Sequence, residues 1–166
     1  MPNLLRLKIK SSVQIAGVLT LTIRQASIAD IDLLVPLFDA YRQFYNQPSD
    51  LAAARAFLAL RFEHQQSVIF IAFEAERALG FTQLYPSFSS TRLTRMFVLN
   101  DLYVSPAARG LGAGNALLDA ACAYGRKVGA SQLSLRTAAD NTTAQALYER
   151  AGWVRDTQFF TYGIAL

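Results

Sequence analysis

Three alternate glycines stand in front of the most helix-like run of this chain. The stretch SPAARGLGAGNALLDAA (Ser105 to Ala121) places Gly110, Gly112 and Gly114 before small and apolar residues, and the strand-like MFVLNDLYV (Met96 to Val104) precedes it. Glycine accepts a positive φ and lets a ligand approach the backbone, and the first turn of a helix leaves N–H groups without partners. The order strand, glycine loop, helix therefore predicts an anion site at the positive end of the helix dipole.

The spacing separates this loop from two common phosphate loops. A nucleotide-triphosphate loop requires Lys after its last glycine, whereas Asn115 follows Gly114 here. A dinucleotide loop requires Gly or Ala three residues after its second glycine, where this chain has Asn115 or Leu117. The remaining pattern is Arg109-x-x-Gly112-x-Gly114.

The hydrophobic periodicity predicts a mixed α/β fold, because strand-like and helix-like segments alternate along the chain. We expect residues 1–19 to form an N-terminal extension and residues 20–166 to form a single domain. Strands are expected at 20–27, 67–73, 77–86, 96–104, 131–137 and 153–164. Helices are expected after Ser27, at 51–62, from the glycine loop to about Lys127, and at 142–151.

A second motif, DNTTAQALYERAGW, runs from Asp140 to Trp153. On a helix, Asn141, Ala144 and Tyr148 share one face, and the small Ala144 leaves room for a ligand between the two polar side chains. Asn141 can also cap the helix. A phenol with a reference pKa of about 10 stays protonated at neutral pH, so the Tyr148 hydroxyl can act as a proton donor. The alternative is that Tyr148 only packs on an amphipathic helix.

These two motifs resemble the GNAT superfamily of N-acetyltransferases, and the resemblance covers roughly residues 20 to 165. It implies a central mixed sheet with a splayed strand and helices on both faces. It also implies that acetyl-CoA binds as co-substrate, with Asn141 at the pantetheine and Tyr148 near the thioester sulfur. The backbone groups expected to hold the cofactor are those of Leu102, Tyr103, Val104, Arg109, Gly110, Leu111, Gly112, Ala113 and Gly114.

Two further roles stay open in the sequence. The Arg109 side chain either contacts the diphosphate or is a solvated loop residue. The strand reads Asn100-Asp101 where the polyamine-acetylating branch of the family often reads Glu-Asp, so an amide that cannot take a proton replaces the first carboxylate. Asp101 then acts as base directly, acts through water, orients the amine, or is only a bulge carboxylate that caps a backbone N–H.

The acceptor site is expected beside the first two helices. Tyr41, Tyr45 and Tyr85, together with Asp101, suit a protonated amine with an alkyl body, although aromatics at helical spacing are more often core. The combination looks most similar to the small acetyltransferases of the polyamine and histone type.

Composition argues against a nucleic-acid-binding protein, a metal-binding protein and a membrane or secreted protein. The net charge is +4 and the pI is near 9.5, but Lys and Arg are scattered, which argues against a nucleic-acid partner and fits a polyanionic co-substrate. One cysteine and one histidine offer no metal-ligand cluster. Lys8 and Lys10 interrupt the apolar N-terminus, so we expect no membrane span or signal peptide and a cytoplasmic protein.

The sequence thus predicts an enzyme that transfers acetyl from acetyl-CoA to a primary amine of a small molecule or a protein. Direct attack is expected, without a covalent acetyl-enzyme, because Cys122 falls on the apolar side of a helix and is expected to be buried. The alternative is a non-catalytic acyl-CoA-binding module, which the missing Glu at position 100 favours. The apolar ending QFFTYGIAL (Gln158 to Leu166) predicts a homodimer.

Overall fold

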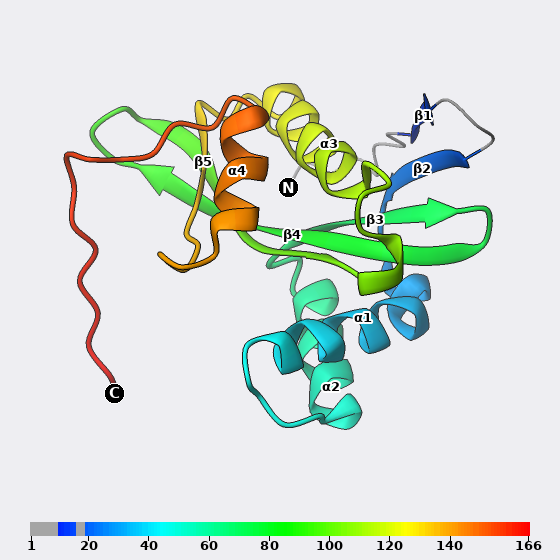
Figure 1. Cartoon of the computed structure of the whole chain (residues 1–166). Coiled ribbons are helices and arrows are strands. Elements are labelled where there is room, and N and C mark those ends of the chain that lie inside the picture. The colour runs from blue at the N-terminus through cyan, green and yellow to red at the C-terminus, as the bar shows by residue number, and fades with distance from the viewer. Residues whose placement is uncertain (1–9, 16–18) are drawn as a thin grey trace. The chain divides into compact units, whose positions relative to one another are not determined.

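A computed structural model describes residues 10–15 and 19–166 of the chain (Figure 1). The chain forms two compact units, one that ends at Arg136 and one from Thr137 to Leu166. The first unit contains β1 (Lys10–Ile15), β2 (Leu19–Gln25), α1 (Ile31–Phe44), α2 (Leu51–Glu63), β3 (Val68–Glu74), β4 (Arg77–Ser89), β5 (Thr94–Val104), α3 (Ala113–Lys127) and β6 (Gln132–Leu135). The second unit contains α4 (Thr142–Arg150).

The strands of the first unit form one sheet in the order β1-β2-β3-β4-β5-β6. Neighbours from β1 to β5 pair antiparallel, and β6 pairs parallel to β5. This mixed sheet confirms the predicted α/β fold class. Strand β1 lies inside the segment expected to be an extension and adds an edge strand that the sequence analysis did not predict; the domain boundary at residue 20 stays a prediction.

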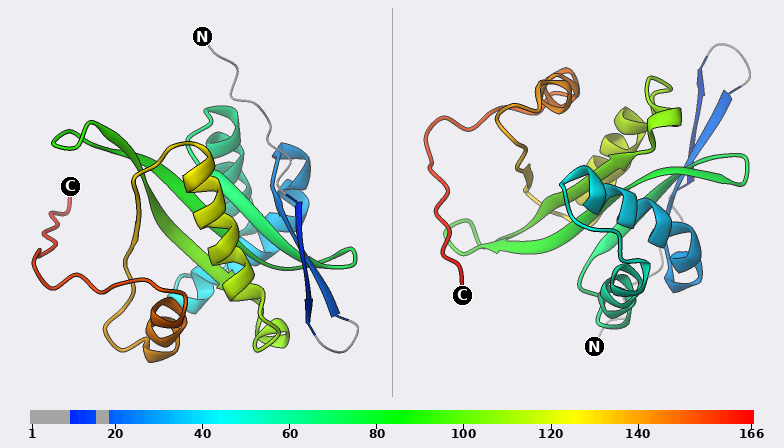
Figure 2. Two further views of the ribbon diagram at one scale, coloured as in Figure 1. Left: turned by 90° about the horizontal axis from the view of Figure 1, so that it is seen from above. Right: turned by 60° about the horizontal axis from the view of Figure 1, so that its bottom comes forward.

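Helices cover both faces of this sheet (Figure 2). Helices α1 and α2 pack on one face, where the ring centres of Phe38 and Phe81 lie 5.9 Å apart. Helix α3 packs on the other face, where the Tyr124 ring lies 5.7 Å from that of Phe70 and 5.5 Å from that of Phe97. Burial of these apolar faces supplies the main driving force for folding of the unit.

A β-bulge interrupts the pairing of β4 and β5. Leu84 lies opposite Leu99, and Gln83 lies opposite Asp101, so Asn100 is the extra residue on β5. Because side chains alternate along a strand, the bulge changes the face to which odd-numbered residues of β5 belong. Odd-numbered residues before the bulge, such as Phe97, lie on the face that α3 covers. Odd-numbered residues after the bulge, such as Tyr103, lie on the face that α1 covers.

The contacts of Tyr103 show this change of face. The Tyr103 ring lies 6.3 Å from that of Tyr41 in α1 and 6.5 Å from that of Phe81, and Tyr103 belongs to the buried cluster under α1 and α2. The bulge therefore places Asp101, two residues before Tyr103, on the face that α1 and α2 cover.

The second unit begins with a capped helix. The Asn141 side chain accepts a hydrogen bond from the Ala144 N–H at 3.1 Å, and Gly152 follows the helix with φ of 81°. Both features are typical of helix ends. The prediction of a strand at 153–164 is wrong, because the second unit contains no strand. A strand forms only when its backbone pairs with a neighbour, and composition alone does not supply one.

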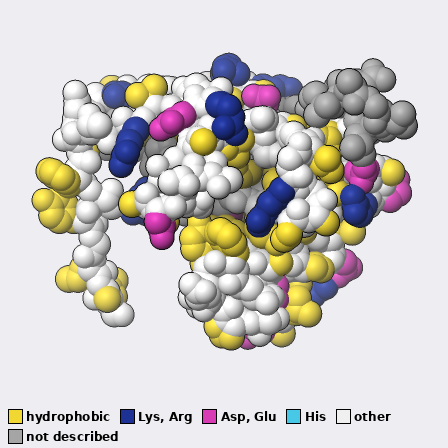
Figure 3. Space-filling model, viewed as in Figure 1, with side chains coloured by type: hydrophobic (Ala, Val, Ile, Leu, Met, Phe, Trp, Pro, Cys, Tyr) yellow, Lys and Arg dark blue, Asp and Glu magenta, His cyan; other side chains and the backbone are white. Residues whose placement is uncertain are grey.

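Among the residues that the structure describes, no helix is long and apolar enough to cross a membrane. On the face shown in Figure 3, Lys and Arg side chains stand among uncharged ones instead of gathering in one patch.

Candidate active site

The glycine loop has the backbone geometry that the sequence predicts. Gly110 and Gly112 have φ of 79° and 82°, a region that favours glycine. Gly112 is the N-cap of α3 and no side chain caps this end of the helix. Helix α3 starts at Ala113, so Gly114 belongs to its first turn and not to the loop as predicted. The N–H groups of this turn therefore face the end of the helix where its dipole is positive.

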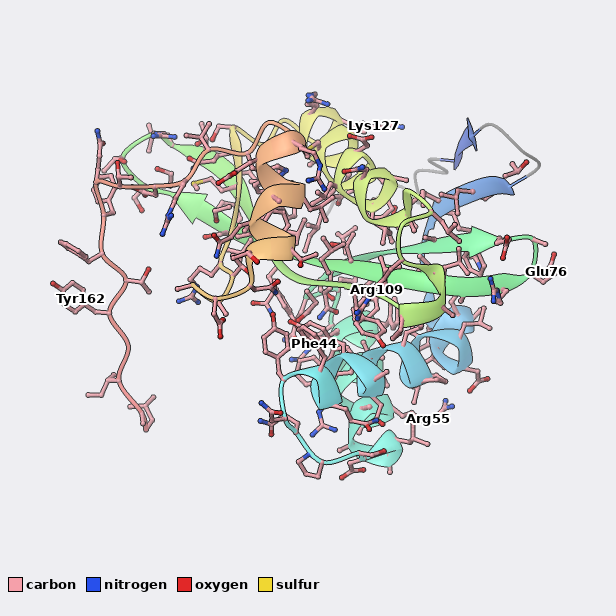
Figure 4. All side chains as sticks on the ribbon, in the orientation of Figure 1. Phe44, Arg55, Glu76, Arg109, Lys127 and Tyr162 are labelled. Atoms are coloured by element: carbon pink, nitrogen blue, oxygen red, sulfur yellow. The ribbon has the colours of Figure 1, made fainter. Side chains whose placement is uncertain are left out.

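Arg109 folds back onto the end of β5. Its Nε donates a hydrogen bond to the Val104 carbonyl at 3.2 Å, and its guanidinium carbon lies 6.0 Å from the centre of the Phe44 ring (Figure 4). The side chain is exposed. A guanidinium has five N–H donors, so this hydrogen bond leaves others for an anion.

Beyond the bulge, β5 is paired on one side only in the described part of the first unit. Strand β6 pairs with β5 from Met96 to Leu99 and ends there, while β4 continues along β5 to Val104. The segment expected to pair with pantetheine, Leu102 to Val104, therefore lies beyond the end of β6. This arrangement is the splayed strand that the resemblance predicts.

Gly80 fixes how closely β4 approaches this segment. A Cβ at Gly80 would lie 2.3 Å from the Tyr103 carbonyl oxygen and 3.0 Å from the Val104 Cα. No side chain fits there without moving β5. The sequence analysis did not identify Gly80 as a site residue, although a glycine inside a strand often marks such a close approach.

Asp101 is the centre of a buried polar cluster. Its exposed fraction is 4%, and Gln83 donates from Nε2 to Asp101 Oδ2 at 2.8 Å. Burial raises the pKa of Asp101, and hydrogen bonds from Gln83, Tyr41 and Asn100 oppose part of this effect. No Lys or Arg forms an ion pair with Asp101 among the residues described. A raised pKa brings a carboxylate closer to the range of a general base at neutral pH.

Asn100 supports the Asp101 carboxylate. The Asn100 Nδ2 donates to Asp101 Oδ1 at 3.0 Å, and its backbone carbonyl accepts a hydrogen bond from the Tyr41 hydroxyl at 3.5 Å. The amide that replaces the expected Glu thus donates a hydrogen bond to the remaining carboxylate.

The three predicted acceptor tyrosines lie near this cluster. Tyr41 hydrogen-bonds to it, and the Tyr85 hydroxyl accepts a hydrogen bond from Gln83 Nε2 at 2.8 Å. The ring centre of Tyr45 lies 5.2 Å from that of Tyr41. The structure therefore brings together the residues that the sequence assigned to the acceptor amine.

Gln83 links the parts of the cluster, and the sequence analysis missed it. It is fully buried, its Oε1 accepts from Ser67 Oγ at 3.0 Å, and its Nε2 donates to both Asp101 and Tyr85. A polar residue within the apolar run GFTQLY was the available signal.

Two other polar residues have structural roles. Asp39 accepts hydrogen bonds from the Ser49 hydroxyl at 2.7 Å and from the Asp50 N–H at 2.8 Å, which hold the connection between α1 and α2 and lower the pKa of Asp39. Cys122 is half-buried instead of fully buried as predicted, because it lies at the edge of the buried stripe of α3. Burial still raises the pKa of its thiol. The described residues contain no group of three or more metal-ligating side chains.

The second unit carries Asn141 and Tyr148 on α4. Asn141 caps the helix, which confirms the capping role that the sequence predicts for it. The Tyr148 ring lies 6.3 Å from that of Trp153, and the Tyr148 carbonyl accepts from the Trp153 N–H at 3.0 Å.

Comparison with known proteins decides the family. The sequence matches the Acetyltransferase (GNAT) family over residues 34–153, which include the glycine loop, the Asp101 cluster and α4. The chain belongs to the GNAT acetyltransferase family. This confirms the resemblance found in the sequence.

The GNAT relatives extend this result. The Bacillus subtilis (strain 168) protein "Uncharacterized N-acetyltransferase YhfO" is 49% identical over 142 residues, which cover 86% of this chain and 95% of that protein. A mycothiol acetyltransferase of Geodermatophilus obscurus is 37% identical over 90 residues, 52% of this chain and 28% of that protein.

Solved GNAT structures agree in fold. The crystal structure of a probable acetyltransferase is 41% identical with a TM-score of 0.83 and covers 87% of this chain and 97% of its own. An aminoglycoside N-acetyltransferase in complex with CoA is 18% identical with a TM-score of 0.75, covers 92% of this chain and 100% of its own, and shares the fold.

Proposed function

We propose that this GNAT protein transfers the acetyl group of acetyl-CoA to a primary amine by direct attack within a ternary complex. The observation that carries the proposal is the buried Asp101 carboxylate, which hydrogen bonds orient and no cation pairs among the described residues. A buried carboxylate without a counter-charge is costly, so a protonated amine is a favourable ligand for it.

In the proposed reaction Asp101 removes a proton from the bound ammonium group, directly or through one water. The free amine then attacks the thioester carbonyl carbon, and a C–N bond forms while the carbonyl oxygen becomes an oxyanion. Main-chain N–H groups of β5 from Leu102 to Val104 are proposed to stabilise that oxygen. When the oxyanion collapses, the C–S bond breaks, CoA leaves as a thiolate, and the nitrogen of the new amide releases its second proton to water.

We assign the protonation of the thiolate to Tyr148, which donates from its hydroxyl and then regains a proton from water. The support is the family resemblance of the Asn141 to Trp153 motif, together with the chemistry of a phenol at neutral pH. Asn141 is proposed to contact the pantetheine in addition to its capping role.

The diphosphate of acetyl-CoA is proposed to bind at the glycine loop. Positive φ at Gly110 and Gly112 and the uncapped start of α3 fit a ligand held by main-chain N–H groups. The exposed guanidinium of Arg109 is proposed to add a charge-assisted contact. A related fold that binds CoA, the aminoglycoside N-acetyltransferase, supports the same choice of co-substrate.

The proposal is tested by calorimetric titration with acetyl-CoA, followed by a thiol-release assay with a panel of primary amines. Binding in the titration and release of CoA with at least one amine are expected. Binding without turnover on a broad panel would instead favour the non-catalytic acyl-CoA module, and absence of binding would contradict both functions.

We further propose that the protein acts in the cytoplasm as a homodimer, without a nucleic-acid or membrane partner. A lone cysteine suits a reducing compartment, and the apolar segment QFFTYGIAL is suited to contact with a second copy. Sedimentation at low micromolar concentration is expected to show a dimer; a monomer alone would contradict this assignment.

A further inference from the structure

Arg61 is a cation without a carboxylate partner in the described part of the chain. It lies in the last turn of α2, half-buried, with its guanidinium carbon 4.3 Å from the centre of the Phe57 ring. Its Nε is buried and donates to no acceptor among the described residues. Four other arginines of the first unit pair with Asp or Glu: Arg24, Arg42, Arg55 and Arg77.

Two neutral groups connect Arg61 to the Asp101 cluster. Arg61 lies close enough to the Tyr85 hydroxyl to lower the pKa of that group, and the same hydroxyl accepts from Gln83 Nε2 at 2.8 Å. The same Gln83 nitrogen donates to Asp101 at 2.8 Å. Burial and the charge of Asp101 raise the pKa of Tyr85, while the charge of Arg61 opposes them, so the hydroxyl lies within reach of both charges.

The arrangement keeps a positive and a negative group near each other without letting them neutralise one another. Asp101 is buried and the half-buried Arg61 has its Nε shielded from water, and a charge without a partner is unfavourable in such surroundings. The guanidinium stacks over the Phe57 ring, and its planar set of donors matches the two oxygens of a carboxylate. A ligand with both charges would satisfy both sites at once.

We propose that the acceptor is an amine that also carries a carboxylate, with the amine at Asp101 and the carboxylate at Arg61. This inference rests on the proposed acetyl transfer and narrows its substrate class. Tyr85 and Gln83 then separate the two charged subsites and set the number of bonds between amine and carboxylate.

The test uses matched amines in the thiol-release assay. The probes are amino acids with one to five carbons between amine and carboxylate, the carboxamide of each, and α-amino acids with their amides. We expect kcat/KM for the best acid to exceed that of its amide by about 10- to 100-fold, the size of a hydrogen-bonded charged contact. The best chain length reports the spacing of the two subsites.

Variants assign the preference to Arg61. Arg61→Gln is expected to abolish the preference for the acid, because the KM of the acid rises while the KM of the amide changes little. Arg61→Lys is expected to keep part of the preference. Arg55→Gln, on the same helix but exposed and paired with Asp32, is the control and should keep the full preference. Melting temperatures show which variants are folded, and the wild-type comparison of acid with amide needs no variant.

The outcomes separate this inference from the function on which it rests. Equal kcat/KM for acids and amides, or equal loss of both in Arg61→Gln, would overturn the carboxylate subsite and leave acetyl transfer standing. A protein that binds acetyl-CoA but acetylates no amine would overturn the transfer itself, and the subsite with it.

Discussion

The Nε2 of Gln83 lies 2.8 Å from Oδ2 of Asp101, across the pair of strands that carries the bulge. Gln83 is fully buried and its other end is held by Ser67, so the amide donates to the carboxylate from a fixed position. This relationship makes the Asp101 carboxylate an oriented hydrogen-bond acceptor on the α1 face of the sheet, and it determines what substitutions there should do.

Asp101→Asn is expected to reduce kcat by about 10² to 10⁴, the usual contribution of a general base, with little change in acetyl-CoA affinity. Asn100 is exposed and can turn its amide to accept from the new Asn. Thiol release and calorimetry measure the two effects. Turnover close to wild type on the best amine would show that Asp101 is only structural.

In the wild type, we expect the contribution of Asp101 to folding stability and its contribution to activity to change in opposite directions as pH rises. Because the pKa of Asp101 is raised in the folded protein, this group binds more protons folded than unfolded between its unfolded and folded pKa values. Its contribution to stability therefore falls as pH rises through that range, while activity rises as the carboxylate ionises. Asp101→Asn should remove this fall, so its melting temperature at pH 7 should equal or exceed that of the wild type.

Gly112→Asp is expected to weaken acetyl-CoA binding at least tenfold, since it adds a Cβ and a negative charge beside the proposed diphosphate site. Gly129→Asp is the matched control: it adds the same charge at a glycine of similar φ, 72° against 82°, beyond the other end of α3. Calorimetry on both folded variants measures the difference. Equal affinities would exclude the loop as the diphosphate site.

Tyr148→Phe keeps the ring that contacts Trp153 and removes only the hydroxyl. We expect normal acetyl-CoA binding and a loss in kcat of about 10² to 10⁴, which should shrink with an acyl donor whose thiol leaves more easily. Tyr162→Phe, in the same unit, is the control and should have no effect. If Tyr148→Phe turns over its best amine at the wild-type rate, the proton donor is another group.

Gly80→Ala tests the close approach of β4 to β5. The added Cβ would meet the Tyr103 carbonyl, so β5 must move, and overpacking of this kind costs about 1–3 kcal/mol. A lower melting temperature and a higher KM for acetyl-CoA are expected together, because the displaced segment is the one proposed to bind pantetheine. A destabilised variant with unchanged KM would remove Leu102 to Val104 from the cofactor site.

Local signals in the sequence predicted much of this fold. Helix α3 ends at Lys127, close to its predicted end, because capping, glycine and apolar spacing are properties of neighbouring residues. The tyrosines near Asp101 followed from the family resemblance. The prediction of a strand at 153–164 was wrong, because apolar residues favour an extended backbone but do not supply the neighbouring strand with which it must pair.

The contacts of Arg61 and Gln83 could not be predicted in the same way. Arg61 reaches Tyr85 from a different element, and Gln83 meets Asp101 only because of the register of two strands. No glycine or proline marks the bulge at Asn100. A single extra residue there decides which side chains face each other, and its place depends on packing across the whole sheet.

The bulge at Asn100 also divides one strand into two independently variable parts. Phe97 packs against α3, whereas Asp101 and Tyr103 lie on the face covered by α1. Substitutions of Phe97 therefore alter packing against α3, whereas those of Asp101 and Tyr103 alter packing and hydrogen bonding under α1. Asp101 and Tyr103 can therefore change without disturbing the contact of Phe97 with the helix that follows the glycine loop.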